Sequence, residues 1–346
     1  MGTMGIYTDI LRPILFKFPP EQSHKIGQLI LSSRQLWRLL GPMLSLQDPL
    51  LRTRLSTIDL PNPVGLAAGY DKNCDTLESL ANIGFGYITG GTIVSKPRDG
   101  NPQPRILRVP TSEGMINSLG FPSDGLARVM DKVSSHNRLN VPLLLSISGI
   151  STEEIVECYI TQDVCSAIEL NISSPNTQGI RIFQNPGILK ELLQTLQPIK
   201  TKPLLIKLPP FFGRIQTEDT YRIIDVCLDH GLDGFTVANT WPIENAGLAV
   251  GRGGLSGKPL FMHMLDMVKS IRNYVGNNVA INACGGISSG EDAVKALIAG
   301  ANTVQLYTGF IYQGPRLIAN INKYILDYMT ERGIPSIESI ALDANN

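Results

Sequence analysis

The stretch Ala167–Arg181, AIELNISSPNTQGIR, joins an apolar segment to a polar turn. Its first half alternates apolar residues as a buried β-strand does, and its second half is rich in small, turn-forming residues. Asn171, Ser174 and Asn176 follow the strand within six positions. Amides and a hydroxyl at the end of a buried strand suit a planar polar ligand, because they both donate and accept hydrogen bonds. We therefore take this loop as the centre of a ligand site.

The chain on both sides of this loop repeats the same plan from about residue 46 onward. Most short apolar runs lead into a polar or Gly-rich turn and then into a segment with helical periodicity. This alternation predicts a parallel (β/α)8 barrel, with an open doubly wound sheet as the alternative. The predicted strands are Val64–Ala68, Tyr87–Ile88, Val141–Ile147, Ala167–Ile172, Leu204–Leu208, Gly234–Ala238, Val279–Ala283 and Thr303–Leu306. The predicted helices include Glu153–Tyr159, Pro186–Leu196, Asp219–Asp229, Pro259–Tyr274 and Gly290–Ala299.

Three segments fall outside this alternation. Residues 1–45 contain two helical patterns separated by Pro19-Pro20, which predict a helical hairpin that packs on the barrel or meets a membrane surface or lipophilic ligand. Pro97–Phe121 is too long for a plain βα loop, and the alternation at 106–109 predicts a small hairpin over the barrel mouth. The barrel is expected to span 46–335, and residues 336–346 to form a loose tail.

The composition excludes several classes of protein. The chain has 346 residues, of which 43% are hydrophobic, and its 30 basic and 30 acidic residues cancel. Nucleic-acid binders usually carry a basic excess, so none is expected as a partner. The five cysteines are scattered without a CxxC pair, and the four histidines form no HExxH motif, so we expect neither disulfides nor a metal site. No apolar run is long enough to span a bilayer.

The carboxyl ends of barrel strands carry the active site in this fold. The residues predicted there include Lys72, Thr92, Lys207, Asn239 and Thr240. Glycine-rich turns follow the seventh and eighth strands, at Gly285-Gly286 and at 307–309, where this fold commonly binds phosphate through backbone N–H groups. Together these turns favour a phosphorylated cofactor.

Seven motifs in order resemble the membrane-associated, quinone-using class 2 of the dihydroorotate dehydrogenase family, and FKFPPEQSHK (16–25) extends the likeness to the N-terminus. They are LPNPVGLAAGYDKN (60–73), GNPQPRILRV (100–109), MINSLGF (115–121), LNISSPNTQGIR (170–181), VANT (237–240), GGLSGKPL (253–260) and VQLYTGFIYQGP (304–315). The resemblance implies an FMN-binding barrel that oxidises dihydroorotate to orotate in pyrimidine biosynthesis. Hydride would pass from C6 of the substrate to flavin N5, and the electrons would pass on to a quinone.

The resemblance also implies roles for particular residues. Ser174, the second serine of NISSPN, corresponds to the base that takes the C5 proton. A serine is a weak base at its free pKa and needs assistance, which the sequence does not identify. The residues implied for the substrate are Lys72, Asn117, Phe121, Asn171, Asn176, Asn239 and Thr240. Those implied for FMN are Ala68, Gly69, Lys72, Thr92, Asn171, Lys207, Gly257, Gly286, Tyr307 and Thr308, with Lys207 near flavin N1. Those implied for the quinone are His24, Arg108 and Tyr307.

The chain departs from the family pattern at four places. Leu145–Ser148 stands where the third strand commonly reads I-N-I-G-K, so that Ser146 or a water is expected to replace an asparagine contact to FMN. Thr89–Thr92 replaces E-I-G-T, and Pro122 replaces an asparagine. Trp241 replaces a small residue, and it is expected either in the wall of the substrate pocket or in the sixth βα loop.

Two other functions stay open beside the quinone-linked dehydrogenase. One is a diverged FMN oxidoreductase that acts on another cyclic amide or uses another acceptor. The other is a non-catalytic FMN- or membrane-binding homologue, which the retention of Ser174, Lys72 and the asparagines disfavours. The N-terminal hairpin and the lack of a presequence predict a peripheral protein on the cytoplasmic face of a bacterial inner membrane.

Overall fold

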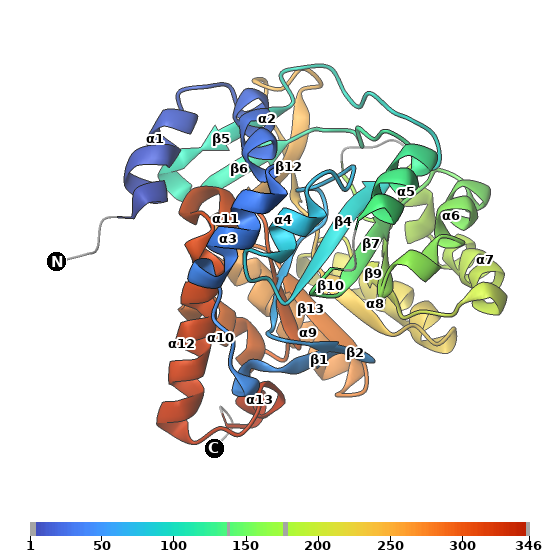
Figure 1. Ribbon diagram of the computed structural model, residues 1–346. Helices are drawn as coiled ribbons and strands as arrows, with labels where there is room; N and C mark the ends of the chain where they lie inside the picture. The colour runs from blue at the N-terminus through green and yellow to red at the C-terminus, as the bar shows by residue number, and fades with distance from the viewer. Residues whose placement is uncertain (1–4, 137–138, 176–178, 344–346) are drawn as a thin grey trace.

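The protein is a closed barrel of parallel strands surrounded by helices, as the computed structural model shows for residues 5–136, 139–175 and 179–343 (Figure 1). Within these residues eight strands close the barrel in the order β10-β13-β14-β3-β4-β7-β8-β9, and β10 also pairs with β9. This closure confirms the (β/α)8 prediction and excludes the open sheet. The barrel strands are β3 (Val64–Leu66), β4 (Tyr87–Ile93), β7 (Leu143–Ile147), β8 (Ala167–Asn171), β9 (Leu204–Lys207), β10 (Gly234–Val237), β13 (Ala280–Cys284) and β14 (Thr303–Leu306).

Helices cover the outside of the barrel, because each strand buries its outward apolar side chains against them. Three of them begin with a side chain that accepts a hydrogen bond from the first turn, namely α6 at Ser151, α7 at Asn185 and α10 at Ser289. The helices of the barrel are α4 (Leu77–Ala81), α5 (Leu126–Ser135), α6 (Thr152–Tyr159), α7 (Pro186–Leu196), α8 (Gly213–Asp229), α9 (Phe261–Val275), α10 (Gly290–Ile298), α11 (Thr308–Gln313) and α12 (Arg316–Arg332). Helix α8 begins at Gly213, earlier than its predicted start at Asp219.

The lower end of the barrel is closed by an apolar plug. The short strands β1 (Thr53–Leu55) and β2 (Ile58–Leu60) form an antiparallel hairpin that was not predicted, and it lies below the barrel in Figure 1. Leu55, Ile58 and Leu60 pack there against the lowest layer of inward-facing side chains in the barrel. That layer consists of Tyr87, Leu144, Ala167, Leu205 and Ala280. A methyl group at Gly65 would overlap the ring of Tyr87, so the tyrosine fills space that only glycine leaves.

The next layer of the barrel interior is polar. Side chains two residues further along a strand point to the same side, so Ser146, Glu169 and Asn282 lie above Leu144, Ala167 and Ala280. All three are fully buried. The candidate site therefore rests on a polar floor rather than directly on the apolar plug.

A four-stranded antiparallel sheet lies over the upper end of the barrel, in the order β11-β12-β6-β5. Its strands β5 (Ile106–Val109) and β6 (Gly114–Asn117) form the hairpin that the sequence predicts. The strands β11 (Trp241–Glu244) and β12 (Arg252–Gly257) form a second hairpin that was not predicted. The β12–β6 pairing joins the two hairpins, so two insertions far apart in the sequence make a single roof.

The N-terminal extension is helical, as predicted, but its second pattern is two helices rather than one. A π-helical turn (Ile6–Leu11) and α1 (Arg12–Leu15) end before Pro19-Pro20, and α2 (Pro20–Leu31) and α3 (Arg34–Leu44) follow. The chain breaks at Ser32-Ser33 although the apolar spacing continues across it. Tyr7 Oη donates to the carbonyl of Ile311 at 2.6 Å, and Arg105 Nε lies 3.3 Å from a Glu21 carboxylate oxygen, so the extension is tied to both α11 and the roof.

The prediction of a loose C-terminal tail from residue 336 is wrong for most of that segment. Ile337–Ser339 forms a 3-10 turn, and α13 (Ile340–Asp343) follows it. Ile337 and Ile340 are buried in the main hydrophobic core. Two apolar side chains are enough to dock this short segment on the barrel.

Candidate active site

One cavity at the carboxyl ends of the strands gathers nearly all of the predicted site residues. Those that line it are Ala68, Gly69, Lys72, Thr92, Asn117, Phe121, Asn171, Ser174, Lys207, Asn239, Thr240, Gly257, Gly286, Tyr307 and Thr308. They come from both halves of the barrel and from β6 and β12 of the roof. Asn176 lies outside the residues that the structure describes. His24 and Arg108 lie elsewhere, around a second cavity.

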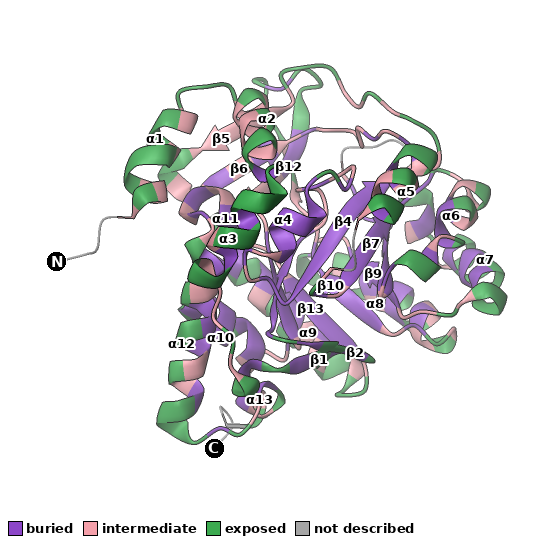
Figure 2. Cartoon of the chain, in the orientation of Figure 1, coloured by how far each residue is buried: buried purple, intermediate pink, exposed green. Residues whose placement is uncertain are grey.

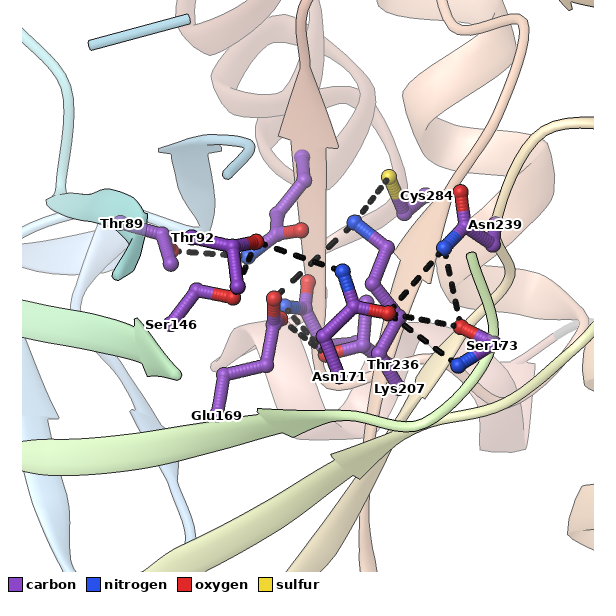
Figure 3. A network of polar contacts seen from close by, with 12 residues as sticks. Thr89, Thr92, Ser146, Glu169, Asn171, Ser173, Lys207, Thr236, Asn239 and Cys284 are labelled. Atoms are coloured by element: carbon purple, nitrogen blue, oxygen red, sulfur yellow. Dashed lines mark hydrogen bonds and ion pairs between the residues drawn. The ribbon is translucent and has the colours of Figure 1, made fainter. Parts of the chain in front are cut away.

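An amide network fixes the asparagines on one side of the cavity (Figure 3). Asn171 Nδ2 donates to Thr92 Oγ1 at 3.3 Å, and Asn171 Oδ1 accepts from Ser173 Oγ and Asn239 Nδ2. Asn239 Nδ2 also donates to Ser173 Oγ at 2.9 Å. These contacts orient both amides. Ser174 lines the same cavity and is buried.

Ser146, which was expected to replace the asparagine contact to FMN either itself or through a water, lies behind Thr92. It is fully buried and is absent from the described lining of the cavity. Its Oγ lies 3.0 Å from Thr92 Oγ1, and Thr92 lines the cavity (Figure 3). Thr92 therefore lies between Ser146 and the cavity, and the serine supports Thr92 from below.

Lys207 brings a buried positive charge to the wall of the cavity. Its Nζ lies 4.0 Å from Glu169 Oε1 in the polar floor and 3.8 Å from Cys284 Sγ. Burial alone lowers the pKa of Lys207, but Cys284, when it is a thiolate, and the Glu169 carboxylate act in the opposite direction and give this pKa a net rise. The lysine therefore stays charged at neutral pH.

Lys72 brings a second amine to the same cavity, in a different electrostatic setting. Its Nζ donates to the carbonyl oxygen of Gly69 at 2.6 Å. Burial lowers the pKa of Lys72 to about 8, although the nearby Asp71 carboxylate acts in the opposite direction. A cation that is incompletely stabilised by the protein gains from an anionic ligand, because the ligand restores the missing charge partner.

The donor set of the cavity fits a large polar ligand with a phosphate. Thr240 Oγ1 and Gln305 Oε1 are buried atoms of lining residues and have no hydrogen-bond partner among the described residues. Buried polar atoms are normally paired, so these two mark positions for ligand contacts. The backbone of Gly257, Gly286 and Gly309 also lines the cavity, and no side chain there shields its N–H groups.

Trp241 lies outside the described lining of this cavity. Its ring stacks on His263, with centroids 5.5 Å apart, and meets the edge of Phe212 at 6.4 Å. The tryptophan therefore packs against the loop before α8 and the start of α9, and it is not a wall of the substrate pocket.

A second and larger cavity of about 1270 Å³ lies beneath the N-terminal helices. Its lining is mostly apolar and includes Ile26, Leu31, Trp37 and Phe310. His24, Arg108 and Tyr307 also line it, together with Tyr70, which the sequence analysis did not single out. Tyr307 lines both cavities, so a single side chain stands between them.

The polar residues of the second cavity are held by identifiable contacts. The His24 ring meets Tyr70 edge to face at 5.8 Å. Burial, helped by the charge of Lys72, lowers the pKa of His24 to about 4, so this imidazole is neutral at physiological pH. Arg108 donates to the carbonyl oxygen of Phe18 at 2.8 Å and lies over the ring of Phe16.

Several residues of these cavities were missed by the sequence analysis. Glu169 is a charged residue inside an apolar strand. That signal could have located the polar floor, but the site residues predicted within the barrel were taken from the ends of the strands. Cys284 at the end of β13 and Gln305 in β14 line the cavity, but neither was assigned a role from the motifs. Tyr70 lies inside the motif AAGYDKN, in which a glycine and a lysine were assigned roles but the tyrosine was not.

Two further properties bear on the kind of site this is. Among the described residues no group of three or more His, Cys, Asp and Glu is arranged to hold a metal ion. No helix in the described part of the chain combines the length and apolarity that a bilayer-spanning helix needs.

The sequence profile of the family "Dihydroorotate dehydrogenase" matches residues 50–329. A dihydroorotate dehydrogenase (quinone) from Methylococcus capsulatus is 35% identical over 342 residues, which cover 92% of this chain and 99% of that protein. The enzyme of the same name from Chelativorans sp. is 34% identical, with coverage of 97% of this chain and 96% of that one.

Solved structures give the same result. The DHODH of Eimeria tenella in complex with ferulenol superposes with a TM-score of 0.82 at 28% sequence identity, and the match covers 96% of this chain and 99% of that one. Its ligand-free form gives a TM-score of 0.76 at 29% identity, with coverage of 89% and 97%. The likeness extends through the N-terminal helices as well as the barrel.

Proposed function

Because this chain belongs to the dihydroorotate dehydrogenase family, we propose that it oxidises dihydroorotate to orotate and passes the electrons to a quinone. The observation that carries the proposal is the pair of cavities that meet at Tyr307. One carries two lysines and several amides in its wall and suits a small anionic ring, whereas the other is lined by apolar side chains of the N-terminal helices and suits an isoprenoid quinone. Two chemically different substrates thus have adjacent and separate sites.

FMN is the cofactor that we assign to the polar cavity. Lys207, Thr92, Asn171 and Gln305 would hold its ring, and the backbone at Gly257, Gly286 and Gly309 would hold its phosphate. The unpaired Gln305 oxygen, the glycine backbone that lines the cavity and the buried cation support this assignment. When bound, FMN supplies a two-electron acceptor that lies between the substrate and the quinone.

The substrate ring is assigned to the side of the cavity that carries the amides. Asn117, Asn171 and Asn239 offer donors and acceptors to its amide edges, and Lys72 offers a positive charge to its carboxylate. The hydrogen bonds among Asn171, Ser173 and Asn239 support this role, because they fix two of the amides before any ligand binds.

Ser174 is the base that we assign to the C5 proton of the substrate. It lies in the turn after β8 and lines the cavity together with Asn171, Asn239 and Thr240. Its neighbour Ser173 donates to Asn171 Oδ1 and is absent from the described lining of the cavity. Oxidation of the C5–C6 single bond to a double bond needs loss of a hydride from C6, which would pass to FMN, and loss of a proton from C5. The Ser174 hydroxyl would take the C5 proton as it passes its own proton on to solvent.

The N-terminal helices are assigned to the membrane surface. Leu36, Leu39 and Met43 lie at spacings of three and four on α3, so they form one stripe, and Leu39 and Met43 are 75% and 74% exposed. Figure 2 shows exposed residues along the outer faces of α1, α2 and α3. An apolar stripe beside a lipophilic cavity suits peripheral attachment to the cytoplasmic face of a bacterial inner membrane.

The decisive experiment follows the flavin spectrum. The purified protein is expected to be yellow, to bleach on anaerobic addition of dihydroorotate, and to regain colour on addition of a short-chain quinone. A colourless protein that binds no added FMN contradicts the proposal. A flavin that dihydroorotate does not bleach would favour the diverged oxidoreductase, for which Trp241 no longer argues because it lies away from the cavity.

A further inference from the structure

Glu169 is a buried carboxylate that the proposed reaction does not use. It lies on β8, is fully buried and does not line the cavity. Thr236 Oγ1 donates to its Oε2 at 2.7 Å, while its Oε1 has no hydrogen-bond partner among the described residues. The unpaired oxygen faces the ammonium group of Lys207 at 4.0 Å (Figure 3).

This arrangement is costly for stability unless the charge has a purpose. A buried ion pair commonly contributes less than apolar residues of the same size, because both charges lose their hydration. In the described part of the chain, the Glu169 carboxylate is the only anion that forms an ion pair with Lys207. The layer of side chains beneath the pair is apolar, so the pair is not hydrated from that side.

The other titratable groups around Lys207 do not replace Glu169. Cys284 on β13 lies 3.8 Å from Nζ, and burial raises the pKa of this thiol, so its sulfur is uncharged at neutral pH. Tyr87 on β4 donates its hydroxyl to Asn282 and remains neutral. Lys72 lines the same cavity but carries the same sign of charge as Lys207.

We propose that Glu169 is a positioning residue that holds Lys207 as a protonated, cavity-facing cation and thereby sets the reduction potential of the bound flavin. The inference rests on the proposed function in so far as FMN occupies the cavity. A cation beside the flavin favours the reduced form, which carries the additional negative charge. The carboxylate beneath Lys207 has two effects, because it keeps the lysine protonated and also partly offsets its positive charge.

The test is the flavin reduction potential measured against pH from 6 to 10, by titration against a reference dye without dihydroorotate. In Glu169→Gln the offsetting charge is gone, so below pH 7 we expect reduced FMN to gain about tenfold in binding relative to oxidised FMN. For a two-electron couple this is a rise of about 30 mV. Above pH 7 we expect a break absent from the wild type, because Lys207 now loses its proton within the range.

Two further variants separate this effect from a structural one. Glu169→Asp keeps the charge, so its pH profile should lack the break, and a break like that of Glu169→Gln would overturn the proposal. The Glu169→Asp variant also provides a test of the proposal if Glu169→Gln does not fold. Tyr87→Phe removes a buried hydroxyl from the barrel interior without changing any charge, and its potential should match that of the wild type.

The outcomes also separate this inference from the proposed function. If Glu169→Gln binds FMN with the potential and pH profile of the wild type, the inference is wrong and the proposed function is unaffected. If wild-type FMN is not bleached by dihydroorotate, the proposed function fails while the potentials still decide the inference. A wild-type protein that binds no FMN overturns both.

Discussion

Tyr70 and Tyr307 meet edge to face with their ring centroids 5.6 Å apart, and this contact lies where the two cavities adjoin. Tyr70 also touches His24 and Phe310, so the aromatic contacts continue from the polar cavity to the N-terminal helices. The two half-reactions are thus separated by side chains rather than by a long stretch of protein. Their separation makes it possible to disturb one half-reaction and leave the other intact.

Ser174→Ala should slow the reduction of bound FMN by dihydroorotate by about 10²–10⁴-fold, the usual contribution of a positioned acid–base group. FMN binding should not change, because the substitution leaves in place the contacts of Asn171 with Thr92 and Ser173. Anaerobic stopped-flow absorbance measures the reduction rate. Ser173→Ala is the matched control, and its rate should fall less because its hydroxyl only orients Asn171 and Asn239. A near-normal rate in Ser174→Ala would remove Ser174 as the base.

Replacement of Leu39 and Met43 by glutamate should weaken binding to anionic phospholipid vesicles by at least about tenfold for each residue. Burial of one large apolar side chain contributes about 1.5–3 kcal/mol, and a charge reverses that contribution. Vesicle co-sedimentation measures the affinity, while turnover with a short-chain quinone should persist. Ile215→Glu is the control, because Ile215 on α8 is 76% exposed and lies away from the N-terminal helices. Equal loss in all variants would argue against this face as the docking surface.

His24 makes stability depend on pH over a defined window. Its pKa is about 4 in the folded protein against about 6.5 when unfolded, so between these values the unfolded state binds more protons. Stability should therefore rise with pH from about 4 to 6.5 and be lost as pH falls through this window, by at most about 3 kcal/mol. Urea unfolding at pH 4.5, 5.5 and 7 measures the slope. His24→Gln should flatten it, and an unchanged slope would assign the effect to other groups.

Trp241→Ala should cost about 1–2 kcal/mol of stability, because the indole loses its aromatic contacts with His263 and Phe212. The KM for dihydroorotate should change less than about threefold, since Trp241 does not line the cavity. Thermal unfolding and steady-state kinetics give the two values. A large rise in KM with unchanged stability would return Trp241 to the substrate pocket.

The sequence was most informative where chemistry and topology coincide. The carboxyl ends of parallel strands converge on one rim, so Lys72, Asn171, Lys207 and Asn239 could be assigned to a single site from the order of strands alone. The roof hairpin at 106–117 was also predictable, because its length exceeds that of an ordinary loop.

The rest depends on contacts that a single sequence does not specify. The break between α2 and α3 falls at two serines inside an apolar pattern that continues across it. The β11–β12 hairpin is glycine-rich and gains its stability from pairing with β6, more than one hundred residues away. Trp241 could not be placed because its partners, Phe212 and His263, belong to other elements.

The plug beneath the barrel restricts the routes by which a ligand can reach the polar cavity. Leu55, Ile58 and Leu60 close the lower end of the barrel against Tyr87, so a ring that enters from water cannot leave through that end. Product release and substrate entry should therefore both take place at the upper end of the barrel. Orotate should accordingly compete with dihydroorotate for the free site, and the rate of its departure sets a ceiling on turnover that faster chemistry cannot lift.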